Sequence, residues 1–201
     1  MVDLSEKVIL ITGVGRGLGR SLAKALAARG AIVAANDITP INVDEVIAQI
    51  NADGGRAKVY IADVSKKIPV QAMINEIIED WGRIDILVNH ANVKPVKPIL
   101  EMDEWDWKRT IDVNLTGAFL AMQSVGRVMA AQGWGVMINL IDNSEKSPSI
   151  AHKTSMQALA TLSKAAADEF GAYNILTYTI KLEPGKSQGE TIQSILSIFN
   201  L

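Results

Sequence analysis

The sequence predicts a single doubly wound α/β domain, in which a parallel sheet of six strands is covered by helices on both faces. Two observations predict this fold class. Short β-branched apolar runs alternate with amphipathic helical patterns along the chain, and the runs have no polar face, as expected of strands buried on both sides. The expected strands are residues 7–12, 31–37, 57–63, 84–90, 135–140 and 174–180.

Helical patterns fill the intervals between these runs. Glycines close several of them, at Gly30, Gly54 and Gly82, where a helix commonly ends. The pattern "TIQSILSIFNL" at the end of the chain predicts one more short amphipathic helix. The expected helices before it are residues 18–30, 41–55, 70–82, 103–130 and 149–170.

Size and charge limit what the chain can be. With 201 residues, of which 48% are hydrophobic, the chain has material for one sizeable core, so we expect residues 1–201 to form one domain. The formal net charge is -2 and no basic run exceeds Lys66–Lys67, which argues against binding of a nucleic-acid backbone.

The residue types also bear on location. There is no cysteine, and the two histidines lie far apart in the sequence, so disulfides, thiolate metal sites and histidine metal centres are not expected. The N-terminus "MVDLSEKVIL" lacks the basic and long apolar regions of a secretion signal. No apolar run approaches membrane-spanning length, and we expect a soluble, cytoplasmic protein.

A glycine-rich loop lies between the first strand and the first helix. Glycines at such a junction allow a tight turn and let the helix N-terminus approach a pyrophosphate, which the helix dipole favours. Four alternating glycines exceed what a turn alone requires, so we expect dinucleotide binding by the whole loop. Its residues are Thr12, Gly13, Gly15, Arg16, Gly17, Leu18 and Gly19.

An acidic residue ends the second strand, about twenty residues beyond the loop. Asp37 is placed where a carboxylate accepts hydrogen bonds from the ribose of an adenosine. Since a carboxylate repels a 2′-phosphate, Asp37 favours NAD over NADP, and Arg16 in the loop is a mild contrary signal.

These residues resemble the short-chain dehydrogenase/reductase family. Its signature Thr-Gly-x-x-x-Gly-x-Gly is met by "TGVGRGLG", which begins at Thr12. The resemblance covers nearly the whole chain and implies a Rossmann fold and oxidoreductase chemistry. The resemblance makes Asp63 and Val64 the pair that contacts the adenine, and it places Asn89, His90 and Ala91 at the family's Asn-Asn-Ala-Gly motif. Asn114 matches the asparagine that holds a proton-relay water, and Pro184–Gly185 matches the turn after the sixth strand.

The family's catalytic residues are not matched. The resemblance implies a tyrosine and a lysine on the helix that begins near Ser149, and a serine before it. In this chain His152 is found at the position of the tyrosine, Met156 at that of the lysine, and Asp142 or a neighbour at that of the serine. The loop from the serine position to His152 is about three residues shorter than in the family. Met156 neither carries charge nor donates a hydrogen bond, so the nicotinamide-side ribose loses its anchor.

The chain also ends early by the family's standard. After Pro184–Gly185 only "KSQGETIQSILSIFNL" follows, where the resemblance implies a substrate-covering segment, a helix and a last strand. We therefore expect an open site that excludes water poorly, and a sheet edge without its usual neighbour.

Three functions remain open from the sequence. The first is an NAD-dependent oxidoreductase that uses His152 together with Asn114, since imidazole can exchange protons near neutral pH. The second is a family member with impaired or no hydride transfer that acts as a nucleotide sensor or partner subunit. The third is a hydrolase built from Ser144, His152 and Asp142, although the chain has no Gly-x-Ser-x-Gly elbow there.

The resemblance further implies a dimer. Family members commonly associate through two helices, which correspond here to residues 104–130 and 149–171. Trp105 and Trp107 lie two positions apart on the first of them and so face different directions. We therefore expect a homodimer through these helices.

Overall fold

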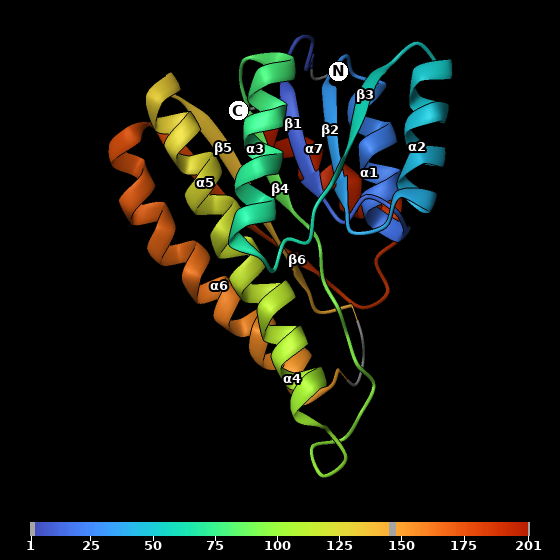
Figure 1. Ribbon diagram of the computed structural model, residues 1–201, viewed down its shortest axis with the longest axis vertical. Coiled ribbons are helices and arrows are strands. Elements are labelled where there is room, and N and C mark those ends of the chain that lie inside the picture. The colour runs from blue at the N-terminus through green and yellow to red at the C-terminus, as the bar shows by residue number, and fades with distance from the viewer. Residues whose placement is uncertain (1–2, 145–147, 201) are drawn as a thin grey trace.

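The computed structural model describes residues 3–144 and 148–200 and confirms the predicted fold class. Six parallel strands form one sheet in the order β3-β2-β1-β4-β5-β6 (Figure 1). Strand order reverses between β1 and β4, which makes their carboxyl ends the topological switch point of the sheet. The strands are β1 (Val8–Thr12), β2 (Ile32–Asp37), β3 (Arg56–Ile61), β4 (Ile86–Asn89), β5 (Gly135–Asp142) and β6 (Ile175–Leu182).

Helices cover both faces of this sheet (Figure 1). One face carries α1 (Gly17–Ala27), α2 (Pro40–Ala52) and α7 (Gln188–Ser197), and the other carries α3 (Lys67–Trp81), α5 (Gly117–Gln132) and α6 (Ile150–Phe170). Helix α4 (Glu104–Ile111) precedes α5, lies beyond the sheet and packs on α6. Short 3-10 turns follow α6 at Gly171–Tyr173 and α7 at Ile198–Asn200.

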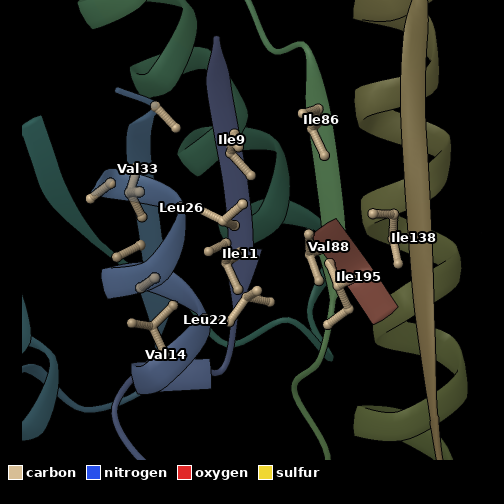
Figure 2. Packing of buried hydrophobic residues seen from close by; sticks show 14 of the residues in the cluster. Ile9, Ile11, Val14, Leu22, Leu26, Val33, Ile86, Val88, Ile138 and Ile195 are labelled. Carbon is tan, nitrogen blue, oxygen red and sulfur yellow. The ribbon is translucent and has the colours of Figure 1, made fainter. Parts of the chain in front are cut away.

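Strand β1 shows how the core divides between the two faces. Ile9 and Ile11 join the cluster under α1, α2 and α7, whereas Val8 and Leu10 join the cluster under α3 and α5. All five residues of β1 are buried, because a central parallel strand is covered on both sides. Figure 2 shows the first of these clusters, with Leu22 of α1 packed beside Ile11.

The long helix predicted for residues 103–130 is interrupted. Helix α4 ends at Ile111, a π-helical turn spans Asp112–Thr116, and α5 follows. Such π turns are frequent at functional sites, and this one contains Asn114. Sequence periodicity did not predict it, because a single extra residue shifts the helical pattern only slightly.

The predicted C-terminal helix is confirmed as α7. A capping box begins it, in which Ser187 and Glu190 bond reciprocally to each other's backbone N–H. Its residues Ile195 and Leu196 are buried in the cluster of Figure 2, on a face of the sheet rather than along its edge. Strand β6 therefore remains at the sheet edge, as the sequence led us to expect.

Within the described ranges, no helix is both long and apolar enough to cross a membrane. The cytoplasmic location is untested by the fold and stays a prediction.

Candidate functional site

A cleft of about 760 Å³ lies at the carboxyl ends of the strands, over the switch point between β1 and β4. Most of the predicted cofactor residues line it. They are Gly13, Gly15, Arg16, Gly17 and Leu18 of the glycine loop, Asp37 after β2, Asp63 and Val64 after β3, and His90 and Ala91 after β4.

The glycine loop is tied to the end of β2. The N–H groups of Gly13 and Val14 donate to the Asn36 carbonyl, and the Gly15 N–H donates to Asp37 Oδ2 at 2.8 Å. Helix α1 begins two residues after Gly15, so its N-terminus lies at the cleft, where the helix dipole favours an anion. This arrangement fits a pyrophosphate next to an adenosine ribose.

Gly19 lies beneath the loop rather than on the cleft wall. A Cβ at Gly19 would stand 2.3 Å from the Gly13 carbonyl oxygen and 2.8 Å from His90 Nδ1, so only glycine lets α1 approach this closely. Gly17 differs, because its Cβ would meet nothing within 4 Å in the protein. Gly19 therefore allows α1 to pack closely against the loop, and Gly17 leaves space open in the cleft.

Asp37 already makes bonds on both carboxylate oxygens. Besides the bond from Gly15, its Oδ1 accepts from the Ile38 N–H at 2.8 Å and the Thr39 N–H at 3.3 Å. The carboxylate is therefore fixed in position at the end of the cleft beside β2. Its two oxygens retain lone pairs that a ribose diol can use.

Asp63 and Val64 have separate roles at the end of β3. Asp63 Oδ1 accepts from the Ser65 N–H at 3.0 Å and the Ser65 hydroxyl at 2.7 Å, which closes an Asx-type turn. Val64 packs against α5, where a Cβ on Gly117 would stand 3.0 Å from Val64 Cγ2. The turn and this close contact hold both residues at the cleft wall.

His90 holds the glycine loop from the opposite side. Its Nδ1 lies 3.1 Å from the Gly13 carbonyl oxygen, and its backbone N–H donates to Thr12 Oγ1. Burial lowers the pKa of His90 below its ordinary value, although the bonds to Gly13 and Thr12 act in the other direction. The ring is therefore neutral at pH 7, and a neutral ring that bonds to a carbonyl through Nδ1 carries its proton there.

Asn89 is not among the described residues that line the cleft. It is buried at the end of β4 and donates to Asn139 Oδ1 at 2.8 Å, which links β4 to β5. Its contact with the dinucleotide stays a prediction, and the two residues that follow it, His90 and Ala91, line the cleft.

Asn114 clamps the segment after β4. Its Oδ1 accepts from the Val93 N–H at 2.7 Å, and its Nδ2 donates to the Val93 carbonyl at 2.9 Å and to Ser155 Oγ at 2.9 Å. The π turn aims this side chain across to α6. In this structure Asn114 therefore organises the backbone that leads to Lys94.

His152 and Met156 are buried on α6, each only 1% exposed. Met156 Sδ accepts a hydrogen bond from the Asp142 N–H at 3.2 Å and so ties α6 to the end of β5. Neither side chain is among the described residues that line the cleft. The predicted catalytic role of His152 stays a prediction, and the histidine's burial weighs against it.

The carboxylate of Asp142 forms a charged pair that sequence reasoning missed. Lys94 Nζ lies 2.7 Å from Asp142 Oδ2, and the Ser144 hydroxyl donates to Asp142 Oδ1 at 2.5 Å. Burial raises the pKa of Asp142, but the bonds from Lys94 and Ser144 outweigh it, so the pKa lies below its usual value. The Ser144 hydroxyl thus points to the Asp142 carboxylate, and this orientation does not suit the nucleophile of a hydrolase.

The segment after β6 borders the cleft more closely than the sequence led us to expect. Glu183, Lys186, Gln188 and Thr191 all line it, beside the loop that holds Gly17. Gln188 Oε1 accepts from the Ser21 hydroxyl at 2.8 Å, which ties the start of α7 to α1. One side of the cleft is therefore covered by the C-terminal segment.

Comparison with known proteins places this cleft in a family. A family model described as short chain dehydrogenase matches residues 7–193. A D-threitol dehydrogenase of Mycolicibacterium smegmatis is 34% identical over 180 residues, which are 88% of this chain and 69% of that protein.

Solved structures agree with this match. The crystal structure of NAD+-bound xylitol dehydrogenase is similar with a TM-score of 0.85 and 28% identity, over 90% of this chain and 71% of that one. A metagenomic short-chain oxidoreductase in complex with NADP gives a TM-score of 0.89 and 26% identity, over 98% and 92% of the two chains. The order of the strands, the glycine loop and these matches together show that the chain belongs to the short-chain dehydrogenase/reductase family.

Proposed function

We propose that this protein binds NAD in the cleft and that its hydride transfer is much slower than that of family members with a tyrosine–lysine pair. The observation that carries the proposal is the contrast between the two ends of the cleft. The glycine loop and Asp37 line the cleft with groups suited to a pyrophosphate and an adenosine ribose, whereas buried His152 and Met156 occupy the helix positions where tyrosine and lysine are expected.

The choice of NAD rests on Asp37. Relatives of known structure hold NAD+ in one case and NADP in another, so the family leaves the choice open. The Asp37 carboxylate, held at the ribose end of the cleft by the Gly15 N–H, favours a ribose diol and disfavours a 2′-phosphate.

Loss of the lysine weakens the hold on the nicotinamide half. Met156 offers no donor to ribose hydroxyls, and its sulfur is occupied by the Asp142 N–H. A nucleotide sensor or partner subunit is therefore the second candidate, since adenosine binding survives the loss. An enzyme that uses His152 is the third, and it requires that buried ring to reach the cleft.

Titration with NADH tests the first proposal directly. We expect saturable energy transfer from the tryptophans to bound NADH, and competition by ADP-ribose within about tenfold of NAD, because only one or two hydrogen bonds of the nicotinamide half are lost. Absence of energy transfer at millimolar NADH would refute dinucleotide binding. A preference for NAD of more than about 100-fold over ADP-ribose would show that the nicotinamide half is firmly held.

Turnover separates the candidate functions. The panel pairs NAD+ with threitol and xylitol, the polyols in the names of two relatives, and NADH with erythrulose and xylulose. We expect turnover below about 0.1 per second, where enzymes commonly reach about 10 per second. Activity that disappears in His152→Ala would support the third candidate.

We also propose a homodimer through the helices of residues 104–130 and 149–171. Trp105 is 67% exposed, Trp107 39% and Phe119 42% on the outer surface of α4 and α5. Exposed aromatic side chains on adjoining helices are typical of an interface. Sedimentation velocity should show a dimer that Phe119→Lys dissociates, and a monomer at micromolar concentration would contradict the proposal.

A further inference from the structure

The ion pair of Lys94 and Asp142 lies at the end of the cleft remote from Asp37. Asp37 and Asp63 follow β2 and β3, on the adenosine side, while Lys94 follows β4 and Asp142 ends β5. A dinucleotide that runs from Asp37 across the glycine loop therefore brings its nicotinamide half toward Lys94. This step rests on the proposed function, that the dinucleotide binds in the cleft.

The position of Lys94 is fixed by its neighbours. Asn114 clamps Val93 on both the N–H and the carbonyl, and Pro95 restricts the backbone on the other side. Asp142 is held in turn by the Met156 sulfur and by Ser144. The side chain of Lys94 is one-third exposed and that of Asp142 7%, so the ammonium group reaches the cleft while its counter-ion stays buried.

Other charged groups line the same cleft. His90 comes from the same segment after β4, Glu183 and Lys186 from the segment after β6, and Arg109 from α4, and all line the same cleft. Glu183 and Lys186 pair with each other at 2.9 Å. Arg109 cannot lose its proton in a protein, and neutral His90 is bonded to the Gly13 carbonyl. Among the described residues at this end, Lys94 is the ammonium group held by a buried carboxylate.

We propose that Lys94 is the proton donor when a carbonyl compound is reduced in this cleft, and that Asp142 is its positioning residue. The reductant is a reduced nicotinamide dinucleotide, whose hydride forms the new C–H bond and which is thereby oxidised. As the carbonyl π bond breaks, the oxygen takes a proton from Lys94 Nζ, so that an N–H bond breaks and an O–H bond forms. Lys94 then regains its proton from water through the exposed side of the cleft.

The ion pair decides which form of Lys94 meets the substrate. A carboxylate 2.7 Å from Lys94 Nζ stabilises the ammonium form, which keeps on the amine the proton that carbonyl reduction needs and also makes that ammonium a weaker acid. Oxidation of an alcohol in the same cleft would need the neutral amine instead.

Three variants test the proposal. Lys94→Met removes the proton, and Lys94→Arg keeps the charge and the partner Asp142 but cannot give up a proton at ordinary pH. Asp142→Asn removes the negative charge that lies 2.7 Å from Lys94 Nζ. Lys97→Met is the matched control, since Lys97 lies in the same segment and pairs with Asp103 and Asp106 instead.

Reduction of erythrulose and xylulose by NADH should fall at least about 100-fold in both Lys94 variants and stay unchanged in Lys97→Met. NADH affinity, measured by energy transfer, should change less than about threefold in the Lys94 variants. In Asp142→Asn, the pH dependence of the rate should differ from that of the native protein, because Lys94 loses the Asp142 carboxylate beside its ammonium group.

A second readout needs no turnover. The rate at which acetic anhydride labels Lys94, followed by peptide mass spectrometry against pH, reports the proton on its amine. Labelling should be slow in the native protein, and faster at a given pH in Asp142→Asn. Bound NADH together with erythrulose should protect Lys94 and leave Lys108, which is exposed on α4, unprotected.

The outcomes separate the two proposals. Failure of NADH to bind the native protein would refute the proposed function itself. NADH binding with full activity in Lys94→Arg, or with no turnover of either ketose by the native protein, would overturn the role of Lys94 alone. Labelling of Lys94 that is unaffected by Asp142→Asn would overturn the positioning role of Asp142.

Discussion

Gly19→Ala is expected to abolish NADH binding and to lower the free energy of unfolding by about 3 kcal/mol or more. The new Cβ would lie 2.3 Å from the Gly13 carbonyl oxygen, a backbone atom that cannot move without moving the loop. It would also press on His90, whose ring holds the same carbonyl. Helix α1 must therefore shift away from the loop that it helps to form.

Gly17→Ala is the companion variant, and it distinguishes an effect on NADH binding in the cleft from an effect on the stability of the fold. Gly17 has φ +57° with open space around its missing Cβ, so alanine there should cost about 1 kcal/mol of stability. Because Gly17 lines the cleft, the added methyl group takes space that a pyrophosphate would fill. We expect NADH affinity to fall about tenfold or more in a protein that remains folded.

Urea unfolding and NADH energy transfer measure both variants. Gly19→Ala with native stability would show that the loop packs differently from the structure. Gly17→Ala with native NADH affinity would place the dinucleotide elsewhere, even if Gly19→Ala proved too unstable to assay.

The sequence predicted the fold because its signal is repeated along the chain. Apolar runs without a polar face recur wherever a strand is buried, and β1 and β5 are buried throughout. The loop from Gly13 to Gly19 was equally visible, since its glycines, its place between a strand and a helix and Asp37 after the next strand all point to one ligand. Most of the cofactor residues predicted in this way line the cleft.

The other end of the cleft was not predictable in the same way. Lys94 and Asp142 are 48 positions apart in the sequence, and only the neighbouring positions of β4 and β5 in the sheet bring them together. A lysine shortly after the end of a strand, beside a switch point, was the available signal. It carried no weight by itself, because most lysines simply face solvent.

The segment after β6 was underestimated for a related reason. Its few residues looked too short to cover anything, yet the bond between Ser21 and Gln188 brings the start of α7 to the cleft. Length alone did not reveal this, because coverage depends on where α7 docks. Ile195 and Leu196 fix that position by burial under the sheet.

Asp37→Asn is expected to narrow the preference for NADH over NADPH from about 100-fold to less than about 10-fold. Two unit charges about 4 Å apart at a protein surface repel by about 4 kcal/mol, so a fixed carboxylate and a 2′-phosphate cannot share the ribose end of the cleft without a large penalty. Asparagine keeps an oxygen that can accept from the Gly15 N–H, and its amide can donate to a phosphate. Asp53→Asn, at the exposed end of α2, removes the same charge away from the cleft and serves as control.

The dissociation constants of both dinucleotides, measured by energy transfer at low and high salt, distinguish a local repulsion from an effect of net charge. Repulsion between Asp37 and the phosphate should weaken only modestly with salt, because the carboxylate is partly buried and bonded to the loop. If Asp53→Asn shifted the preference as far as Asp37→Asn does, the charge of the whole protein would be responsible. If native protein bound NADPH as tightly as NADH, Arg16, which follows Gly15 and lines the same cleft, would be the residue that offsets the carboxylate.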